Sequence, residues 1–466
     1  MQTSPMSDVV SLRKLPQVLW VVFAAIVMSL VGGAGTAMAH NSLSGSSPAE
    51  GDALTTQPTT WSVTFEKSVP LASASAIVVN GDGVRTTLAD PRHGDTDKTV
   101  MFDLPTTLTG NVSARWRLVG SDGHVISGRV AFSVQVAALA TTTTVVVGSG
   151  ATATTSTIAK VAEVFTEDDD DFVAATPEPI RLSLRLVNFL TIVLFGGLLF
   201  TEVVLAPGTL LALVGRRLAL ASVAALALVP FAQYLVFVDD VKGATGTFGG
   251  ALSDSLSLTL GSTLLFRATV GCLLLVIVRE VVRRGLIDRT LSMIVGIASG
   301  IYLLALSLGG HAQTEGTPWL GVPVDMLHTA AIAAWMGGLV TVVFIVAPAG
   351  DAVRAVDVFD RFGKVAERSM AIIVVTGVVQ SAQLHGGLGS IFTTPHGRLL
   401  LLKLAAFGFI VWLAARNRRT LFTTESRTLG RPVATRREIV KASLIEVGLG
   451  IVVLVVSAAM VAASLS

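Results

Sequence analysis

The sequence contains very little sulfur. It has one cysteine, Cys272, and 10 methionines among 466 residues. A disulfide within the chain is therefore excluded, as is a Cys-x-x-Cys metal or redox motif. Because soft metal ions select thiolate and thioether ligands, a sulfur-rich site for such an ion is not expected. Any metal ligands in this chain should be nitrogen and oxygen atoms.

Charged side chains are also scarce. They make up 14% of the residues, whereas a soluble protein usually carries about a quarter. Hydrophobic residues make up 52%, and the mean hydropathy is +0.70. Apolar runs of membrane-spanning length recur in the second half of the chain. The composition predicts an integral membrane protein of which only a part is water-soluble.

Two classes of partner are not expected. The net charge of +2 is too small to suggest binding to nucleic acid. The sequence has no phosphate-binding P-loop motif, so ATP is not expected as an energy source. The basic residues instead cluster in short segments between apolar runs, a distribution that concerns membrane topology.

The first 39 residues have the pattern of a secretory signal peptide. Arg13 and Lys14 precede an apolar stretch at 18–31, and small residues follow up to Ala39. An uncleaved membrane anchor is the alternative interpretation. Cleavage after Ala39 would make His40 the first residue of the mature chain, so that its α-amine and imidazole can bind one metal ion together. An α-amine has a pKa of about 8, so a metal can displace its proton near neutral pH.

Residues 40–135 alternate between apolar and polar side chains in short segments. Turn-forming residues lie between the segments, such as Asn80-Gly81 and Asp122-Gly123. This spacing predicts an exported all-β sandwich with a Greek-key-like arrangement. The clearest alternating segments are 61–65, 76–79, 100–102, 112–116 and 130–134.

The turn at Asp122-Gly123-His124 connects two of these segments. Together with His40 it offers two imidazoles, one amine and one carboxylate. Nitrogen and oxygen donors in a tetragonal plane suit Cu(II). Without His40, the turn would more simply be a hairpin with an exposed histidine. The candidate Cu(II) ligands are therefore His40, Asp122 and His124.

This part of the chain resembles the CopC family of periplasmic copper-binding proteins. In that family the amino-terminal histidine, an aspartate and a second histidine bind Cu(II), which implies these roles for His40, Asp122 and His124. Some members also hold Cu(I) in a methionine-rich segment, but this region contains only Met101. The matching residues are His40-Asn41-Ser42-Leu43, Ser47 to Gly51, Asp122-Gly123-His124, Ser127-Gly128 and Phe132-Ser133-Val134.

The remainder of the chain divides into a linker and a membrane domain. Residues 136–180 are rich in Thr, Ala, Val and Gly and include an acidic run at 167–171, which predicts a flexible linker. Residues 181–466 predict an all-α polytopic domain of about eight transmembrane helices. The apolar runs lie near 182–206, 217–238, 260–281, 290–309, 323–347, 369–385, 397–415 and 442–464.

Basic residues occur mainly in every second loop between these runs. The positive-inside rule therefore places those loops in the cytoplasm and both mature termini outside the plasma membrane. The exported domain is then extracytoplasmic. The predicted inner loops contain Arg216, Arg217, Arg279, Arg283, Arg284, Arg289, Arg354, Arg361, Lys364 and Arg368, and a further basic group from Arg416 to Lys441; the outer loops contain little beyond Lys242 and Arg398.

On this topology the four histidines of the membrane domain all lie near the outer face. They are His311, His328, His385 and His396. Asp325 precedes His328 by three residues and lies on the same helix face. It can ligate a metal or orient the imidazole. His311, Asp325 and His328 are the candidate membrane metal site; the alternative is that these histidines are interfacial and share no metal.

The membrane half resembles the CopD family of copper-resistance membrane proteins. The order CopC-like then CopD-like resembles fused copper-uptake proteins, and the resemblance implies copper passage into the cytoplasm. His396 stands where a tyrosine is commoner in that family. The matching residues are Ser307 to Ala312, Asp325 to His328, Trp335 to Leu339, Arg361-Phe362, Thr376-Gly377 and Thr393 to Lys403.

Three other functions compete with copper capture and import by a non-enzymatic protein. A mature amino-terminal histidine with a second histidine is also the ligand pair of copper monooxygenases, although Asp122 would fill the position that oxygen needs. Histidines on neighbouring membrane helices can ligate haem in an electron carrier. A copper sensor or scaffold would bind the metal without moving it.

Overall fold

The computed structural model describes residues 43–120, 125–135, 176–242, 247–285, 289–310, 317–349, 352–384, 390–421 and 436–461. The predicted signal peptide, most of the predicted linker, and His40, Asp122, His124, His311 and His385 lie outside these residues. The chain divides into two compact units. One unit consists of Met1–Ala37, Pro177–Leu235 and Thr263–Ser466, and the other of Met38–Thr176 and Val236–Ser262.

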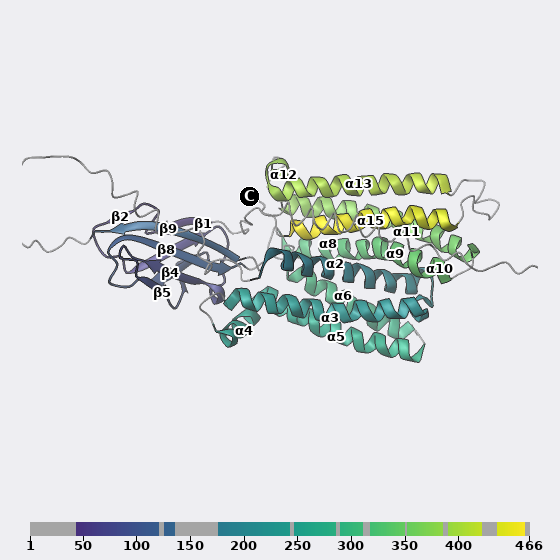
Figure 1. Ribbon diagram of the computed structural model, residues 1–466, viewed down its shortest axis with the longest axis horizontal. Coiled ribbons are helices and arrows are strands. Elements are labelled where there is room, and N and C mark those ends of the chain that lie inside the picture. Colours follow the sequence, from purple (N-terminus) through teal and green to yellow (C-terminus); the bar gives the residue numbers. More distant parts are fainter. Residues whose placement is uncertain are drawn as a thin grey trace, which may run out of the picture. The chain divides into compact units, whose positions relative to one another are not determined.

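The β-strands form two sheets (Figure 1). Neighbouring strands pair antiparallel, except that β2 and β9 pair in parallel. The four-stranded sheet has the order β1 (Leu43–Ser47), β3 (Thr60–Phe65), β7 (Thr99–Asp103) and β6 (Arg92–His93). The five-stranded sheet has the order β2 (Ala53–Leu54), β9 (Val125–Val134), β8 (Gly110–Val119), β4 (Ser75–Val79) and β5 (Arg85–Leu88), and a 3₁₀ turn, η2 (Leu71–Ser73), precedes β4.

Alternating side chains from both sheets form one apolar core. Along β3, Trp61, Val63 and Phe65 are buried while the residues between them are partly exposed. The Phe65 ring meets the Trp116 ring edge-on, with 4.8 Å between centroids. Gly128 lies against the Trp116 indole so closely that a Cβ atom there would be 2.7 Å from it. The predicted all-β sandwich is therefore confirmed.

The remaining elements are helices, and the long ones run side by side in Figure 1. Two proline-initiated helices, α8 and α13, provide the residues that matter most below. The elements are α2 (Glu178–Phe200), η4 (Thr201–Leu205), η5 (Thr209–Leu211), α3 (Leu213–Lys242), α4 (Phe248–Ser257), α5 (Thr259–Arg284), α6 (Arg289–Leu308), α8 (Pro318–Ile332), η6 (Ala333–Gly337), α9 (Gly338–Thr341), η7 (Val342–Val346), α10 (Ala347–Ala349), α11 (Ala352–Leu384), α12 (Ser390–Thr393), α13 (Pro395–Leu421) and α15 (Arg436–Met460).

Within the described residues, seven helical segments are long and apolar enough to cross a membrane. They correspond to seven of the eight predicted runs. The eighth run falls in α11, whose first half carries the i,i+4 ion pairs Arg361–Asp357 and Lys364–Asp360. Only residues 369–384 of this helix are free of charge, a shorter apolar stretch than in the other seven. The chain is a multi-pass membrane protein with seven to eight apolar helices.

The helix α2 and the π-helical turn η6 cross at very close range. A Cβ atom built on Gly337 would lie 1.9 Å from the Val193 carbonyl oxygen, and one built on Gly197 would lie 2.0 Å from the Gly337 carbonyl carbon. Both distances are far below van der Waals contact, so only glycine fits at either position. Small residues that allow close backbone approach are a common basis of helix association in membranes.

We therefore expect Gly337→Ala to destabilise the membrane unit by about 1–3 kcal/mol or more, because the added methyl group forces α2 and η6 apart. Thermal unfolding of the purified chain in detergent measures this loss. Gly300→Ala on α6 is the matched control, since nothing lies within 4 Å of a Cβ atom there. Equal melting temperatures for the two variants would show that the crossing is not as tight as the structure has it.

Candidate metal site in the membrane unit

Of the six predicted metal ligands, Asp325 and His328 lie within the described residues, and both are on α8. This helix packs against α6 and α11. The two side chains are about one turn apart, as their spacing predicts. They nevertheless have different hydrogen-bond partners, which come from both neighbouring helices.

The carboxylate of Asp325 accepts two hydrogen bonds from neutral donors. The hydroxyl of Ser307, near the end of α6, donates to Oδ2 at 2.6 Å. The side-chain amide of Gln380, near the end of α11, donates to Oδ1 at 2.9 Å. Each carboxylate oxygen keeps a further lone pair. Asp325 therefore joins three helices and can still accept a cation.

The imidazole of His328 is buried, with 7% of the residue exposed. Its Nδ1 lies 2.8 Å from the hydroxyl oxygen of Thr376 on α11. That hydroxyl donates to the Ile372 carbonyl at 2.6 Å, so it accepts the proton of Nδ1–H. The tautomer inferred from this contact leaves a lone pair on Nε2.

The Nε2 atom of His328 is buried and has no hydrogen-bond partner among the described residues. Gly377 lies beside the ring, where a Cβ atom would meet Cε1 at 3.8 Å. An imidazole with Nδ1–H held by an oxygen acceptor and Nε2 left without a partner has the arrangement found in histidine metal ligands.

The hydrogen bond that would let Asp325 orient His328 is not formed. Thr376 holds the imidazole instead, and it comes from a different helix. Spacing along one helix indicates which residues share a face, but it does not show which neighbouring helix provides a partner. Thr376-Gly377 is among the residues that resemble the CopD family, although its contact with His328 has no signal in the sequence.

Lys403 on α13 adds a positive charge that interacts electrostatically with Asp325 and with His328. The residue pattern did not predict that Lys403 belongs to this site. A signal was present, because a lysine inside the apolar run 397–415 is costly at membrane depth and such residues are usually functional.

His396 is the second buried histidine of the described membrane region, with 5% of the residue exposed. The sequence predicted that His396 begins a helix, and it lies in the first turn of α13, directly after Pro395. The Thr394 hydroxyl accepts the backbone N–H of Gly397 at 3.0 Å and so caps this helix. Capping by a threonine before a proline explains why the helix begins here and not several residues later.

The described residues contain no group of three or more His, Cys, Asp or Glu side chains arranged to hold a metal ion. In that part of the chain, Asp325 and His328 therefore remain two donors without a third. His311 follows Ser307 by four residues in the sequence, and the predicted site needs it as the additional ligand.

Two other charged residues of the membrane unit are paired separately. Arg267 is buried on α5, where it donates to the Asn188 side-chain oxygen at 2.7 Å and lies over the Tyr302 ring. Glu446 on α15 accepts from the Asn417 side chain at 2.8 Å. Each of these two charged residues therefore has a neutral hydrogen-bond partner.

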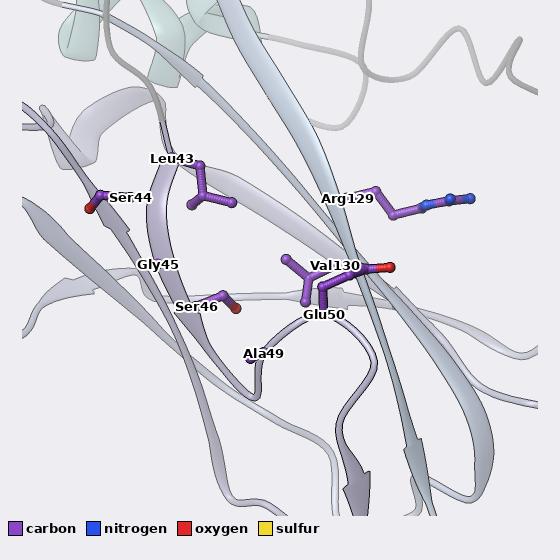
Figure 2. A pocket seen from close by; sticks show the side chains of 8 residues that line it. All are labelled: Leu43, Ser44, Gly45, Ser46, Ala49, Glu50, Arg129 and Val130. Atoms are coloured by element: carbon purple, nitrogen blue, oxygen red, sulfur yellow. The ribbon is translucent and has the colours of Figure 1, made fainter.

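The exported unit has a groove of about 570 Å³ between the beginning of β1 and β9. Leu43 and Val130 point toward one another across it, while the Arg129 side chain extends away (Figure 2). One carboxylate oxygen of Glu50 accepts the backbone N–H of Ala131 at 2.7 Å. Leu43 and Arg129 are close in sequence to His40 and His124, which lie outside the described residues. The residues that line the groove include one acidic and one basic side chain, Glu50 and Arg129.

Comparison with known protein families agrees with this division into a β unit and a membrane unit. Residues 43–135 match the CopC domain family. Residues 356–460 match the family described as Copper resistance protein D, or CopD. This second match covers α11 and α13, and therefore Thr376, Gln380 and Lys403.

Two curated relatives extend the likeness. The chain is 25% identical to the Copper transport protein CutJ of Bacillus subtilis over 420 residues, which is 85% of this chain and 70% of that protein. It is 31% identical to Copper resistance protein D of Pseudomonas syringae pv. tomato over 172 residues, which is 35% of this chain and 56% of that protein.

Solved structures resemble the exported unit. CopC from Methylosinus trichosporium OB3b is 23% identical, with 21% of this chain and 97% of that chain covered and a TM-score of 0.20. PcoC, a copper resistance protein from Escherichia coli, is 20% identical, with 20% of this chain and 99% of that chain covered and a TM-score of 0.19. The chain therefore contains a CopC domain at residues 43–135 and a CopD-family region at residues 356–460, which is the domain order of a CopC–CopD fusion.

Proposed function

We propose that this protein captures Cu(II) outside the plasma membrane and moves copper into the cytoplasm without acting as an enzyme. The observation that carries the membrane part of this proposal is the buried Nε2 of His328, which has no hydrogen-bond partner among the described residues. Burial of a polar nitrogen without a hydrogen-bond partner is costly. The cost is explained if a metal ion binds the lone pair of Nε2 during the working cycle.

The exported site provides the first binding step. His40, Asp122 and His124 supply nitrogen and oxygen donors, which favour Cu(II) over other divalent ions of the first transition series. The name of the relative CutJ, a copper transport protein, supports copper as the ion that is carried.

The membrane site receives the ion next. His328 Nε2 and the remaining lone pairs of Asp325 are the donors, with His311 as the predicted third ligand. On the predicted topology α8 begins at the outer face, so Asp325 and His328, about two to three turns from that end, belong to the outer half of the membrane. An inside-negative potential favours inward movement of a cation by about 2.3 kcal/mol per charge per 100 mV. The ion therefore moves with the electrical gradient.

Copper accumulation in membrane vesicles tests this function and its direction. We expect right-side-out vesicles that contain the protein to accumulate copper faster than vesicles without it, and an inside-negative potential to increase the rate. The Asp325→Asn variant keeps a side chain of the same size and should lose most of this uptake. Copper binding without accumulation would instead support a sensor or scaffold, and accumulation only in inside-out vesicles would reverse the direction.

A further inference from the structure

Lys403 and Asp325 carry opposite charges at the same depth in the membrane unit. Each residue lies about two turns after the first residue of its helix, Pro395 of α13 and Pro318 of α8. On the predicted topology both helices begin on the extracytoplasmic side. The two side chains therefore lie in the same layer of the membrane.

The hydrogen bonds to Asp325 come from neutral groups and leave its negative charge uncompensated. The Ser307 hydroxyl and the Gln380 amide are the two donors. The charge of Lys403 acts on this carboxylate through space, and it acts on His328 as well. The same ammonium group therefore acts electrostatically on both donors to which the proposed function assigns the copper ion.

A fixed ammonium charge has opposite effects on the empty and the occupied site. In the empty site it balances the carboxylate, so that the buried cluster is neutral overall. In the occupied site it repels the metal cation, and this repulsion is much stronger in a protein interior than in water. A site without such a charge would hold copper more tightly and release it more slowly.

We propose that Lys403 is a built-in competitor of the transported ion, which balances Asp325 when the site is empty and promotes copper release when the site is full. This inference rests on the proposed function. It assigns to Lys403 a role in release and not in ligation, because an ammonium group has no lone pair to offer a metal. A purely structural counter-ion would behave differently, since its removal would weaken both the fold and copper binding.

The test compares Lys403→Met, which removes the charge and keeps the length of the side chain, with Lys403→Arg, which keeps the charge. The full chain is used with His124→Ala in every variant, so that the exported site does not mask the membrane site. Copper binding to the purified protein is measured by competition with a chelator, using Cu(II) and, separately, Cu(I) prepared with a reductant. We expect Lys403→Met to bind copper at least about tenfold more tightly and Lys403→Arg to stay within about threefold of the parent.

Uptake by vesicles is the second readout. We expect Lys403→Met to lower the steady rate of copper accumulation severalfold although it binds the ion more tightly, because release becomes slow. A variant that merely lost structure would lose binding and uptake together. Unchanged or weaker binding by Lys403→Met, with the parent binding normally, would overturn the inference.

A second pair of variants keeps the proposal testable if Lys403→Met does not fold. Asp325→Asn leaves Lys403 without its opposite charge, and the double variant Asp325→Asn with Lys403→Met removes both charges. If Lys403 competes with the metal ion, the double variant should bind copper more tightly than Asp325→Asn alone. Equal binding by the two variants would contradict this role of Lys403. If the parent itself binds no copper, the proposed function fails before this inference is tested.

Discussion

Replacing His328 with asparagine abolishes copper accumulation while the protein remains folded. This is the outcome we expect, because the asparagine side-chain amide can still donate to the Thr376 hydroxyl, as Nδ1–H does in the structure. The substitution removes only the Nε2 donor, which is buried and has no partner in the described part of the chain. We expect uptake by vesicles to fall at least tenfold, with a melting temperature close to that of the parent.

Two further variants separate ligation from packing at this position. Thr376→Val removes the acceptor for Nδ1–H but leaves Nε2 in place, and loss of such an outer partner typically costs 10–100-fold in metal affinity or activity. His93→Ala in the exposed strand β6 is the matched histidine control and should leave uptake unchanged. Normal uptake by His328→Asn would rule out Nε2 as a ligand and leave the membrane site without its main donor.

Adding one residue before His40 abolishes tight Cu(II) binding by the exported domain. In the proposed site of the mature chain, the α-amine and the imidazole of His40 would bind the same ion and close a chelate ring, with Asp122 and His124 as the other predicted ligands. An extra residue converts the amine into an amide and separates the new amine from the imidazole. We expect the affinity to fall at least about a hundredfold, where each factor of ten corresponds to about 1.4 kcal/mol.

The measurement is a Cu(II) titration of residues 40–135, a region with its own apolar core of residues from both sheets. The matched protein carries a single additional glycine before His40, and circular dichroism establishes that both are folded. One-to-one binding that only the unextended protein shows would establish the amino-terminal site. Equal binding by the two would contradict the chelate and leave the membrane histidines as the main evidence for copper handling.

Local chemistry in the sequence is enough to predict both kinds of architecture. Trp61, Val63 and Phe65 alternate with polar residues, and this period of two is sufficient to identify a half-buried strand. The long apolar runs likewise identify membrane helices, because a bilayer accepts few other backbone structures. The residue spacing also placed Asp325 and His328 on one face of one helix.

The sequence alone could not predict how these helices are joined at the candidate site. Hydrogen bonds connect Asp325 and His328 to α6 and α11, and the charge of Lys403 on α13 acts on both residues through space. Nothing in the spacing along α8 specifies these partners. Such contacts depend on how closely neighbouring helices approach and on the height at which they meet. In this protein one helix crossing is so close that Gly197 and Gly337 admit no side chain.

The sequence by itself therefore determined the two-part architecture, the series of apolar helices and the residue types available for copper. The tertiary structure decided that Thr376 and not Asp325 holds His328, and that Lys403 shares the site. The physical reason is that hydrophobic periodicity and the distribution of charge can be recognised within one segment of the chain. Hydrogen bonds and electrostatic interactions at the site instead connect helices that are distant in the chain.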